Sequence, residues 1–331
     1  MSRFAVRFVF ISYALLFSHA VLAEQEKSQI GFEAYVTDFK VQALEKGYPT
    51  PFLDRVFSGA TFRQRVVTAD KNQPERKITL DTYLATRVPD WKVRQAVALY
   101  QEHKEVLAQI ENKFAVQARY IVALWGNESN FGKITGNYPV ISSLTTMAYE
   151  GRRETFFRKQ LYAALDILQQ EHISQDEFLG SWAGAMGQSQ FMPTSFLHYA
   201  YDFDGDGKKD IWGNPSDVFA SIANFLKSEG WDNKATWGRQ VKLKKGFDFS
   251  LAGLARNKMR SLSDWQAQGV RRYDGSPLPL VDIKASLIMP DGEKGRIYLV
   301  YDNFHTLLGW NRSSYFAVAV SYLADRIKKG S

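Results

Sequence analysis

The sequence predicts a mainly α-helical protein with a small β element late in the chain. Through roughly the first two-thirds of the chain, apolar side chains recur at the spacing of one helical face, and glycines and prolines interrupt the runs. After Trp237 apolar and polar residues alternate, as they do in half-buried strands. With 331 residues, 45% of them hydrophobic, the chain can bury a sizeable core in one large domain or two small ones.

The first 23 residues have the pattern of a cleaved secretory signal. Arg3 and Arg7 precede the apolar run FVFISYALLF at 8–17, and VLA at 21–23 places small or aliphatic residues at the cleavage point. A membrane anchor is the alternative, but the run is short for a span of about 20 residues and contains polar side chains. We therefore expect residues 24–331 to form a soluble domain that is exported to the periplasm.

The absence of cysteine and the basic charge limit the possible partners. Without cysteine the chain has no disulfides, no thiolate metal site and no cysteine nucleophile, and it lacks the cysteine that a lipid anchor requires. Loss of Arg3 and Arg7 with the signal lowers the formal charge from +7 to +5. We expect no nucleic acid partner for an exported protein. An acidic envelope polymer fits better, and a mildly basic surface without special meaning is the alternative.

The first helices are indicated by an apolar stripe and by a capping signal. The stripe consists of Phe32, Tyr35, Val36, Phe39 and Leu44. It should end at Gly47 and Pro49. Thr50 is expected to cap the next helix, with Pro51 at its first position.

Later segments predict further helices and then strands. Helices are expected over 91–114, over a further segment that ends near Glu128, and over 156–170, 216–228 and 315–328. The strand-like segments are QVKLKKGFDF at 240–249 and GRIYLVYDNF at 295–304. Turn signals at Asp274-Gly275 and Asp291-Gly292 separate the strands.

Glu128 lies at the end of the most apolar helical run of the expected mature chain. Ile121, Leu124 and Trp125 precede it by seven, four and three residues, so the four side chains share one helical face. Desolvation beside Trp125 and the negative end of the helix dipole should raise the pKa of Glu128. A carboxyl group that stays protonated near neutral pH suits a general acid. A structural glutamate in a buried hydrogen-bond network is the other interpretation.

The segment DFDGDGKKD, which begins at Asp202, has the start of a calcium-binding loop. Acids stand at loop positions one, three, five and nine, and Gly207 at position six permits the sharp turn. Position twelve is Gly213, so the closing carboxylate would be Asp217 in an elongated loop. We expect a structural Ca²⁺ and no organic cofactor; the alternative is a solvated turn with Asp217 as a helix N-cap. The expected ligands are Asp202, Asp204, Asp206, Lys208 through its carbonyl, Asp210 and Asp217.

Three motifs occur in order and together carry a family resemblance. They are WGNESNFG at 125–132, GSWAGAMGQSQFMPTSF at 180–196 and DFDGDGKKDIW at 202–212. They resemble the lytic murein transglycosylase B family, glycoside hydrolase family 103. The resemblance runs from residue 30 or so to the C-terminus and includes YDNFHTLLGWN at 301–311. It implies a lysozyme-like core with an additional helical lobe, and a calcium loop of the elongated kind.

The resemblance implies a lytic reaction on peptidoglycan. The glycan strand would be cut between N-acetylmuramic acid and N-acetylglucosamine without water, leaving a 1,6-anhydromuramyl end. Glu128 occupies the position of the family's single catalytic acid, which protonates the glycosidic oxygen and then accepts the proton of the C6 hydroxyl. The substrate's N-acetyl group would replace the second carboxylate of most glycosidases. Glycan strands are the implied partner, with other cell-wall enzymes as further candidates.

The resemblance also implies seven substrate-binding positions. Three of them, Phe225, Trp310 and Phe316, replace family tyrosines, which removes hydroxyl groups but keeps aromatic faces for sugar rings. Ordinary core packing is the alternative for each aromatic residue. The full set is Tyr83, Ser181, Gln190, Phe225, Trp310, Asn311 and Phe316.

Two other functions stay open at this point. A muramidase would admit water to the same site, and a catalytically silent protein would only bind peptidoglycan. The intact Glu128 favours an enzyme. We expect no separate wall-binding module, because the chain ends soon after the last motif of the catalytic core.

Overall fold

The computed structural model describes residues 12–72 and 78–330, with side chains from residue 29 onward. Residues 1–11 of the expected secretory signal therefore lie outside the described residues, and its remainder, 12–23, is described as backbone alone. In the described part, no helix is both long and apolar enough to cross a membrane. The chain divides into two compact units, and each is treated separately below.

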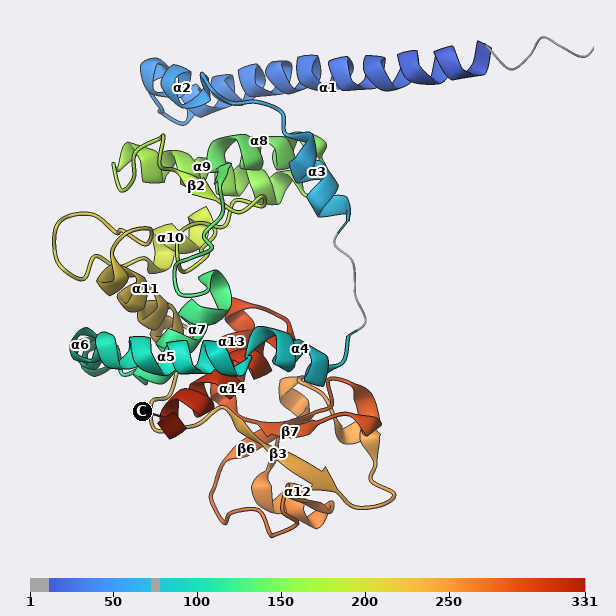
Figure 1. Ribbon diagram of the computed structural model, residues 1–331, viewed down its shortest axis with the longest axis vertical. Helices are drawn as coiled ribbons and strands as arrows, with labels where there is room; N and C mark the ends of the chain where they lie inside the picture. Colours follow the sequence, from blue (N-terminus) through green and yellow to red (C-terminus); the bar gives the residue numbers. More distant parts are fainter. Residues whose placement is uncertain (1–11, 73–77, 331) are drawn as a thin grey trace, which may run out of the picture. The chain divides into compact units, whose positions relative to one another are not determined.

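The first unit comprises the described residues of 1–73 together with 136–186 and 192–194. Its helices are α1 (Ser12–Glu45), α2 (Thr50–Phe57), α3 (Gln64–Lys71), α8 (Val140–Glu150) and α9 (Glu154–Gln169) (Figure 1). The short strands β1 (Tyr138–Pro139) and β2 (Leu179–Gly180) pair antiparallel. Helix α8 packs against α9, α3 and α1, so it lies at the centre of this unit.

The expected stripe on α1 is largely confirmed. Phe32 and Phe39 are fully buried, whereas Leu44 is 41% exposed and Ala43 is buried in its place. The helix ends at Glu45, as the glycine and proline signals indicate. The expected cap at Thr50 is off by one residue: Pro49 takes the extended N-cap conformation, and Thr50 already belongs to α2.

The second unit comprises the described residues of 74–135 together with 187–191 and 195–330. Its helices are α4 (Leu80–Arg87), α5 (Asp90–Glu102), α6 (Lys104–Phe114), α7 (Ala118–Ser129), α10 (Pro193–Tyr199, which begins in the first unit), α11 (Pro215–Ser228), α13 (Asp302–Trp310) and α14 (Ser314–Gly330). Helix α7 packs against α5, α6, α11 and α14. A helix that is apolar on all sides must be buried on all sides, which explains its central place.

The single helix expected over 91–114 is wrong, because the chain turns at His103. There α5 ends and α6 begins. The His103 ring packs edge-on against Phe219, with ring centroids 5.2 Å apart, and against Trp125, 5.9 Å away. Tertiary packing thus breaks a helix whose apolar periodicity continues across the turn.

The late β element is an antiparallel sheet with strand order β4-β6-β7-β3-β5. Its strands are β3 (Gly238–Leu243), β4 (Arg260–Ser261), β5 (Val270–Arg272), β6 (Lys284–Ile288) and β7 (Ile297–Val300). The connections contain α12 (Leu262–Ala267) and the 3₁₀ turns η1 (Phe249–Leu251), η2 (Arg256–Lys258) and η3 (Gly292–Lys294). Both turn signals of the sequence fall between strands, and the expected mainly α class with a small late β element is confirmed.

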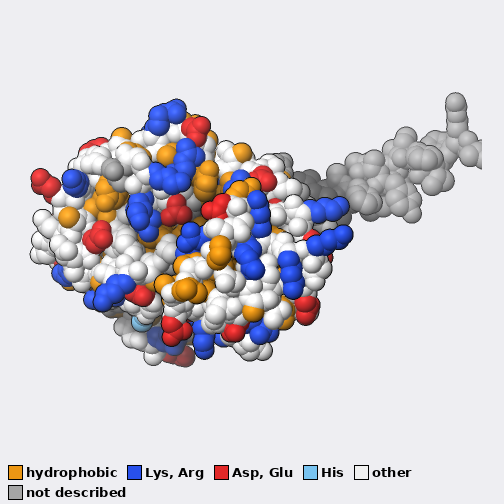
Figure 2. Space-filling view, turned by 90° about the horizontal axis from the view of Figure 1, so that it is seen from below, with side chains coloured by type: hydrophobic (Ala, Val, Ile, Leu, Met, Phe, Trp, Pro, Cys, Tyr) orange, Lys and Arg blue, Asp and Glu red, His pale blue; other side chains and the backbone are white. Residues whose placement is uncertain are grey.

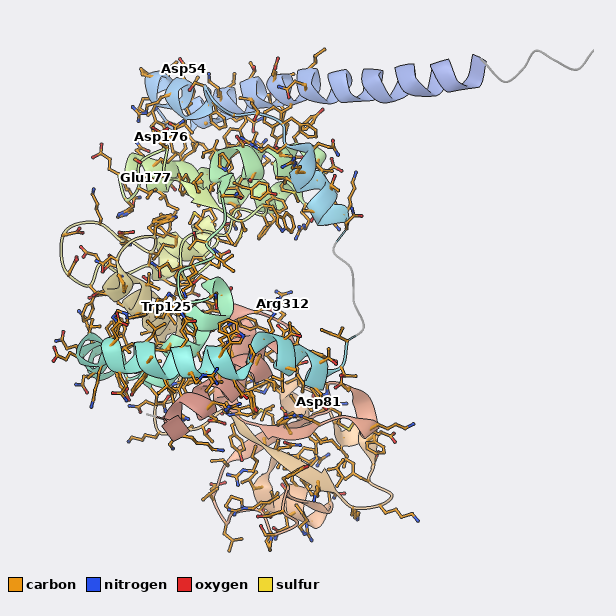
Figure 3. All side chains as sticks on the ribbon, in the orientation of Figure 1. Asp54, Asp81, Trp125, Asp176, Glu177 and Arg312 are labelled. Carbon is orange, nitrogen blue, oxygen red and sulfur yellow. The ribbon has the colours of Figure 1, made fainter. Side chains whose placement is uncertain are left out.

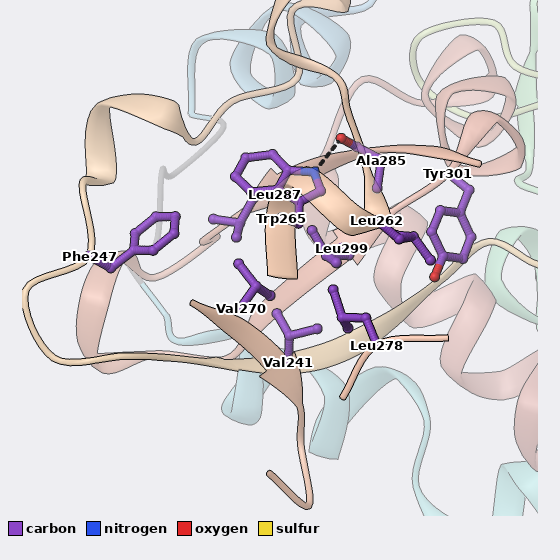
Figure 4. Close-up of a cluster of buried hydrophobic side chains, with 10 residues drawn as sticks. All are labelled: Val241, Phe247, Leu262, Trp265, Val270, Leu278, Ala285, Leu287, Leu299 and Tyr301. Atoms are coloured by element: carbon purple, nitrogen blue, oxygen red, sulfur yellow. Dashed lines mark hydrogen bonds between the residues drawn. The ribbon is translucent and has the colours of Figure 1, made fainter. Parts of the chain in front are cut away.

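A separate hydrophobic cluster stabilises the β element (Figure 4). Trp265 of α12 is fully buried, and its indole N–H donates a 2.9 Å hydrogen bond to the carbonyl oxygen of Ala285. Leu287 and Leu299, on neighbouring strands β6 and β7, pack in the same cluster. The strand pattern of apolar residues therefore supplies a core of its own.

Surface charge does not form one basic patch on the face seen in Figure 2. Lys and Arg side chains there are interspersed with Asp and Glu and with hydrophobic side chains. This distribution fits the mildly basic surface that the composition indicates.

Candidate active site

Helix α7 places Glu128 one residue before its C-terminal end. Ile121 and Leu124 are fully buried and Trp125 nearly so, while Glu128 is only partly exposed (Figure 3 labels Trp125 on this helix). The expectation that Glu128 projects from an apolar helix is met, although α7 is buried on almost every side and not along a single stripe. The acid is the polar end of a core helix.

A tight turn follows Glu128 and folds the chain back on α7. Asn130, Phe131 and Gly132 are three successive residues with positive φ angles of 52°, 59° and 79°. The ring of Phe131 packs edge-on against Trp125 at 5.4 Å. A Cβ atom on Gly126 would lie 2.6 Å from that ring, so this glycine leaves the space that the turn requires.

Gln188 braces the same end of α7, and the sequence reading did not single it out. Its Oε1 accepts a 2.8 Å hydrogen bond from Trp125 Nε1, and its Nε2 donates a 2.8 Å hydrogen bond to the carbonyl oxygen of Trp212. Its backbone N–H donates to the carbonyl of Ile211 at 2.8 Å. The presence of Gln188 in the motif at 180–196 could have marked it as a candidate residue. Its hydrogen-bond partners could not be predicted, because they lie far away in the sequence.

The carboxyl group of Glu128 has one hydrogen-bond donor among the described side chains. Trp310, the last residue of α13, donates from Nε1 to Oε1 of Glu128 at 2.6 Å. Burial raises the pKa of Glu128 to about 7, although the Trp310 N–H and the charge of Arg87 act to lower it. The expected direction of the pKa shift is therefore confirmed.

Aromatic rings form a wall beside the Glu128–Trp310 pair. The Trp310 ring lies 4.7 Å from Phe225 and 5.2 Å from Phe191, centroid to centroid. Tyr199 extends the wall at 4.6 Å from Phe225. Two of the expected substrate-binding residues, Phe225 and Trp310, are thus in contact, and Trp310 also contacts the acid. The sequence motifs do not indicate that Tyr199 joins this cluster.

Tyr83 also lies within electrostatic range of Glu128. Burial raises the pKa of Tyr83 most, Arg87 lowers it, and the charge of Glu128 raises it further. The Arg87 guanidinium stands 5.7 Å from the Tyr83 ring centroid. Tyr315 packs edge-on against Tyr83 at 5.5 Å. Tyr83, one of the seven positions implied by the resemblance, is therefore near enough to the acid to be affected by its charge.

The remaining expected substrate residues are held in different ways. Ser181, in the first unit, accepts a 3.0 Å hydrogen bond from the Ala185 N–H, and its own hydroxyl proton has no partner among the described residues. Gln190 has a positive φ of 50° and donates to the carbonyl of Thr135 at 3.0 Å. Asn311 is exposed, and Phe316 is 7% exposed within the core face of α14.

Three acids of the expected calcium loop converge. One carboxylate oxygen each from Asp202, Asp204 and Asp217 lies within 4.8 Å of the others. Asp217 is fully buried, and desolvation raises its pKa to about 6; N–H groups of Phe203 and Asp210 oppose this shift, and the charges of the other two acids add to it. Converging carboxylates that repel one another fit a divalent cation with oxygen ligands.

The other expected ligands do not join this group of three. Oδ1 of Asp206 accepts from the Lys208 N–H at 2.7 Å, and Oδ1 of Asp210 accepts from the N–H groups of Trp212 and Gly213.

Asp217 is not the N-cap of α11. Asn214 is, because its Oδ1 accepts a 3.0 Å hydrogen bond from the Ser216 N–H. The helix-cap alternative for Asp217 is therefore wrong.

Comparison with known proteins places this geometry in context. The family model described as the transglycosylase SLT domain matches residues 31–325. The chain is 30% identical over 248 residues to the membrane-bound lytic murein transglycosylase B of Escherichia coli, a match that covers 72% of this chain. It spans 64% of the length of that relative.

Two solved structures are similar over most of the chain. SltB3 of Pseudomonas aeruginosa, in complex with NAG-anhNAM-pentapeptide, is 45% identical with a TM-score of 0.87, covering 91% of this chain and 80% of that one. Slt35 of Escherichia coli, in complex with calcium, is 25% identical with a TM-score of 0.77, covering 91% and 93%. These likenesses confirm the resemblance that the sequence motifs carry, and the fold class with it.

Proposed function

We propose that this chain, which belongs to the transglycosylase SLT domain family, is a lytic murein transglycosylase. Its substrate is the glycan strand of peptidoglycan, and it cleaves the β-1,4 bond between N-acetylmuramic acid and N-acetylglucosamine. The similarity to the murein transglycosylase of Escherichia coli supports the reaction class. The similarity to SltB3, solved with a NAG-anhNAM-pentapeptide, supports the substrate class and the anhydro product.

The observation that carries the proposal is the single carboxyl group of Glu128 at the end of α7. A pKa of about 7 lets this group hold a proton before the reaction and lose it during the reaction at neutral pH. The partly exposed Trp310 ring, packed against the buried rings of Phe225 and Phe191, supplies an apolar face beside it. Sugar rings have apolar faces that pack on such side chains, so the wall suits a glycan.

The mechanism needs one protein group that acts twice. Glu128 donates its proton to the glycosidic oxygen as the bond from that oxygen to the muramic acid C1 breaks. The oxygen of the substrate's N-acetyl group supports the positive charge at C1. The C6 oxygen then bonds to C1, and its proton returns to Glu128. No water is consumed, and the enzyme regains its starting protonation state.

Intramolecular attack explains why a second carboxylate is unnecessary. The C6 hydroxyl belongs to the same sugar as C1, which gives it a large effective concentration over water. Ser181 and Gln190 are the proposed hydrogen-bonding residues for the sugar, because the Ser181 hydroxyl proton and the Gln190 Oε1 have no partner among the described residues. Tyr83 and Asn311 are proposed as further polar contacts. Phe225 and Phe316 are the weakest of the proposed positions, because each is only 7% exposed.

The acids Asp202, Asp204 and Asp217 are the proposed ligands of a structural Ca²⁺. The complex of Slt35 with calcium supports the choice of ion. When bound, the ion would offset the mutual repulsion of three close carboxylates and tie their loop to the start of α11. The other expected ligands, Asp206, Lys208 and Asp210, stay candidates that would join by rearrangement of the loop. The reaction itself uses no step at this ion.

We also propose that the chain acts in the periplasm, on the basis of the secretory pattern in its first 23 residues.

The proposed reaction is tested by mass spectrometry of the muropeptides that the purified protein releases from sacculi. Products with 1,6-anhydromuramyl ends are expected from the wild type and not from Glu128→Gln. Reducing ends would identify a muramidase, and an absence of products would identify a binding protein.

A further inference from the structure

Trp310 makes a contact with Glu128 that goes beyond its expected role as a stacking face. Its Nε1 lies 2.6 Å from Oε1 of Glu128, a short distance typical of a hydrogen bond to a charged group. We propose that Trp310 is the positioning residue of the acid and that Glu128 carries its transferable proton on Oε2. This inference rests on the proposed lytic function.

The chemistry of the indole group determines which oxygen carries the proton. An indole N–H only donates a hydrogen bond and never accepts one. Oε1 of Glu128 must therefore be the acceptor whether the carboxyl group is ionised or protonated. The oxygen that bears the acid proton is the poorer acceptor, so the hydrogen bond to Oε1 favours the proton on Oε2, which no described side chain engages. A serine or tyrosine hydroxyl in the same place could accept that proton and blur the assignment.

The Trp310 ring is held in the orientation that this hydrogen bond requires. Phe225 lies at 66° to it and Phe191 at 46°, on α11 and on the segment before α10. The end of α13 is closed directly after Trp310, where the Asn311 N–H donates to the Leu307 carbonyl at 3.1 Å. A donor fixed by packing holds the carboxyl group in one rotamer. Catalytic groups require such preorganisation to transfer a proton in a defined direction.

The hydrogen bond also adjusts the acidity of Glu128. Burial favours the neutral carboxyl group, whereas the Trp310 N–H favours the carboxylate. A group that must serve first as acid and then as base needs both forms accessible at the working pH. Trp310 therefore opposes the burial that would otherwise keep Glu128 permanently protonated.

One test observes the hydrogen bond directly and does not depend on activity. In the full chain labelled with ¹⁵N-tryptophan, the Trp310 indole signal is assigned by its absence in Trp310→Phe. We expect this signal to move with pH, with a midpoint of about 7, and to stop moving in Glu128→Gln. The Trp231 indole, which donates to the neutral Gln117 at 2.7 Å, serves as the reference signal and should stay constant. A Trp310 signal that is independent of pH in the wild type would overturn the inference.

A second test separates positioning from packing. Trp310→Phe retains an aromatic ring in the wall but removes the N–H, so kcat should fall on the order of tenfold while KM changes little. Because the lost N–H favoured the carboxylate, the alkaline limb of the pH–kcat profile should move to higher pH. Trp231→Phe is the matched control, since it removes an indole hydrogen bond away from Glu128. A Trp310→Phe profile that matches the control in kcat and pH limb would contradict the inference.

The two tests also separate this inference from the proposed function. If the wild type releases no anhydro products, or if Glu128→Gln retains full activity, the proposed function fails. If both behave as proposed but Trp310→Phe leaves kcat and the pH limb unchanged, only the role of Trp310 fails. The indole titration reports the contact in either case.

Discussion

The indole nitrogen of Trp125, which lies three residues before Glu128, donates a 2.8 Å hydrogen bond to Oε1 of Gln188. The other end of the same amide donates to the carbonyl of Trp212, next to the acidic loop that begins at Asp202. Gln188 is buried, so both hydrogen bonds are shielded from water. One side chain thus links the end of α7 to the proposed calcium loop.

Gln188→Leu should destabilise the second unit by about 2–3 kcal/mol, because it leaves the Trp125 N–H and the Trp212 carbonyl without this partner in a buried place. It should also lower activity, since the end of α7 loses its brace. Denaturant unfolding of the variant measures the first effect. Gln101→Leu is the control, because Gln101 is an exposed residue of α5. Equal unfolding free energies for the two variants would rule out the brace.

Gly126→Ala should destabilise the protein although alanine is the better helix former. The new Cβ atom would lie 2.6 Å from the Phe131 ring and would push it out of the turn that follows Glu128. Gly309→Ala, in α13, meets only the end of the Glu229 side chain at 3.5 Å and should be tolerated. Melting temperatures of the two variants provide the comparison. A Gly126→Ala variant as stable as Gly309→Ala would show that Phe131 can move at little cost.

Calcium should raise the melting temperature more at about pH 8 than at about pH 5. The pKa of Asp217 is raised from 3.8 to about 6 in the folded chain. Without metal, the folded state therefore loses stability as the pH rises from 3.8 to about 6, because the buried carboxyl group must ionise. A bound cation requires the ionised form and gains affinity over the same window. Thermal unfolding with calcium and with chelator, at both pH values, measures the difference.

Asp217→Asn should abolish the calcium effect, because it removes the buried carboxylate of the group. Asp248→Asn, at an exposed acid outside the loop, should retain it. Melting curves of the wild type that are the same with calcium and with chelator at both pH values would refute the site.

Local sequence spacing was sufficient to predict the parts of the site that are local in the chain. The three-and-four-residue spacing before Glu128 predicted a buried helix with an acid at its end. The alternating acids from Asp202 predicted a metal loop, of which Asp202, Asp204 and Asp217 do converge. In both cases the relevant side chains lie within a few turns of one another, so backbone geometry alone brings them together.

Long-range contacts could not be predicted in this way. Trp310 and Glu128 are 182 positions apart, and only the packing of α13 in the second unit brings them within hydrogen-bond distance. The loss of a tyrosine hydroxyl at position 310 was expected to remove a hydrogen bond, whereas the indole N–H supplies one. The break at His103 has the same cause, since its ring packs on residues far away in the sequence.

The proposed reaction requires Glu128 to act alone, with the substrate's own C6 hydroxyl as the nucleophile. Digestion of purified sacculi in oxygen-18 water tests this directly, followed by mass spectrometry of the released muropeptides. We expect anhydromuramyl ends without heavy oxygen from the wild type, and in Glu128→Gln a loss of rate of at least about 10²-fold because the amide supplies no proton. Wild-type products with reducing ends labelled at the anomeric carbon would contradict the account and identify water as the nucleophile.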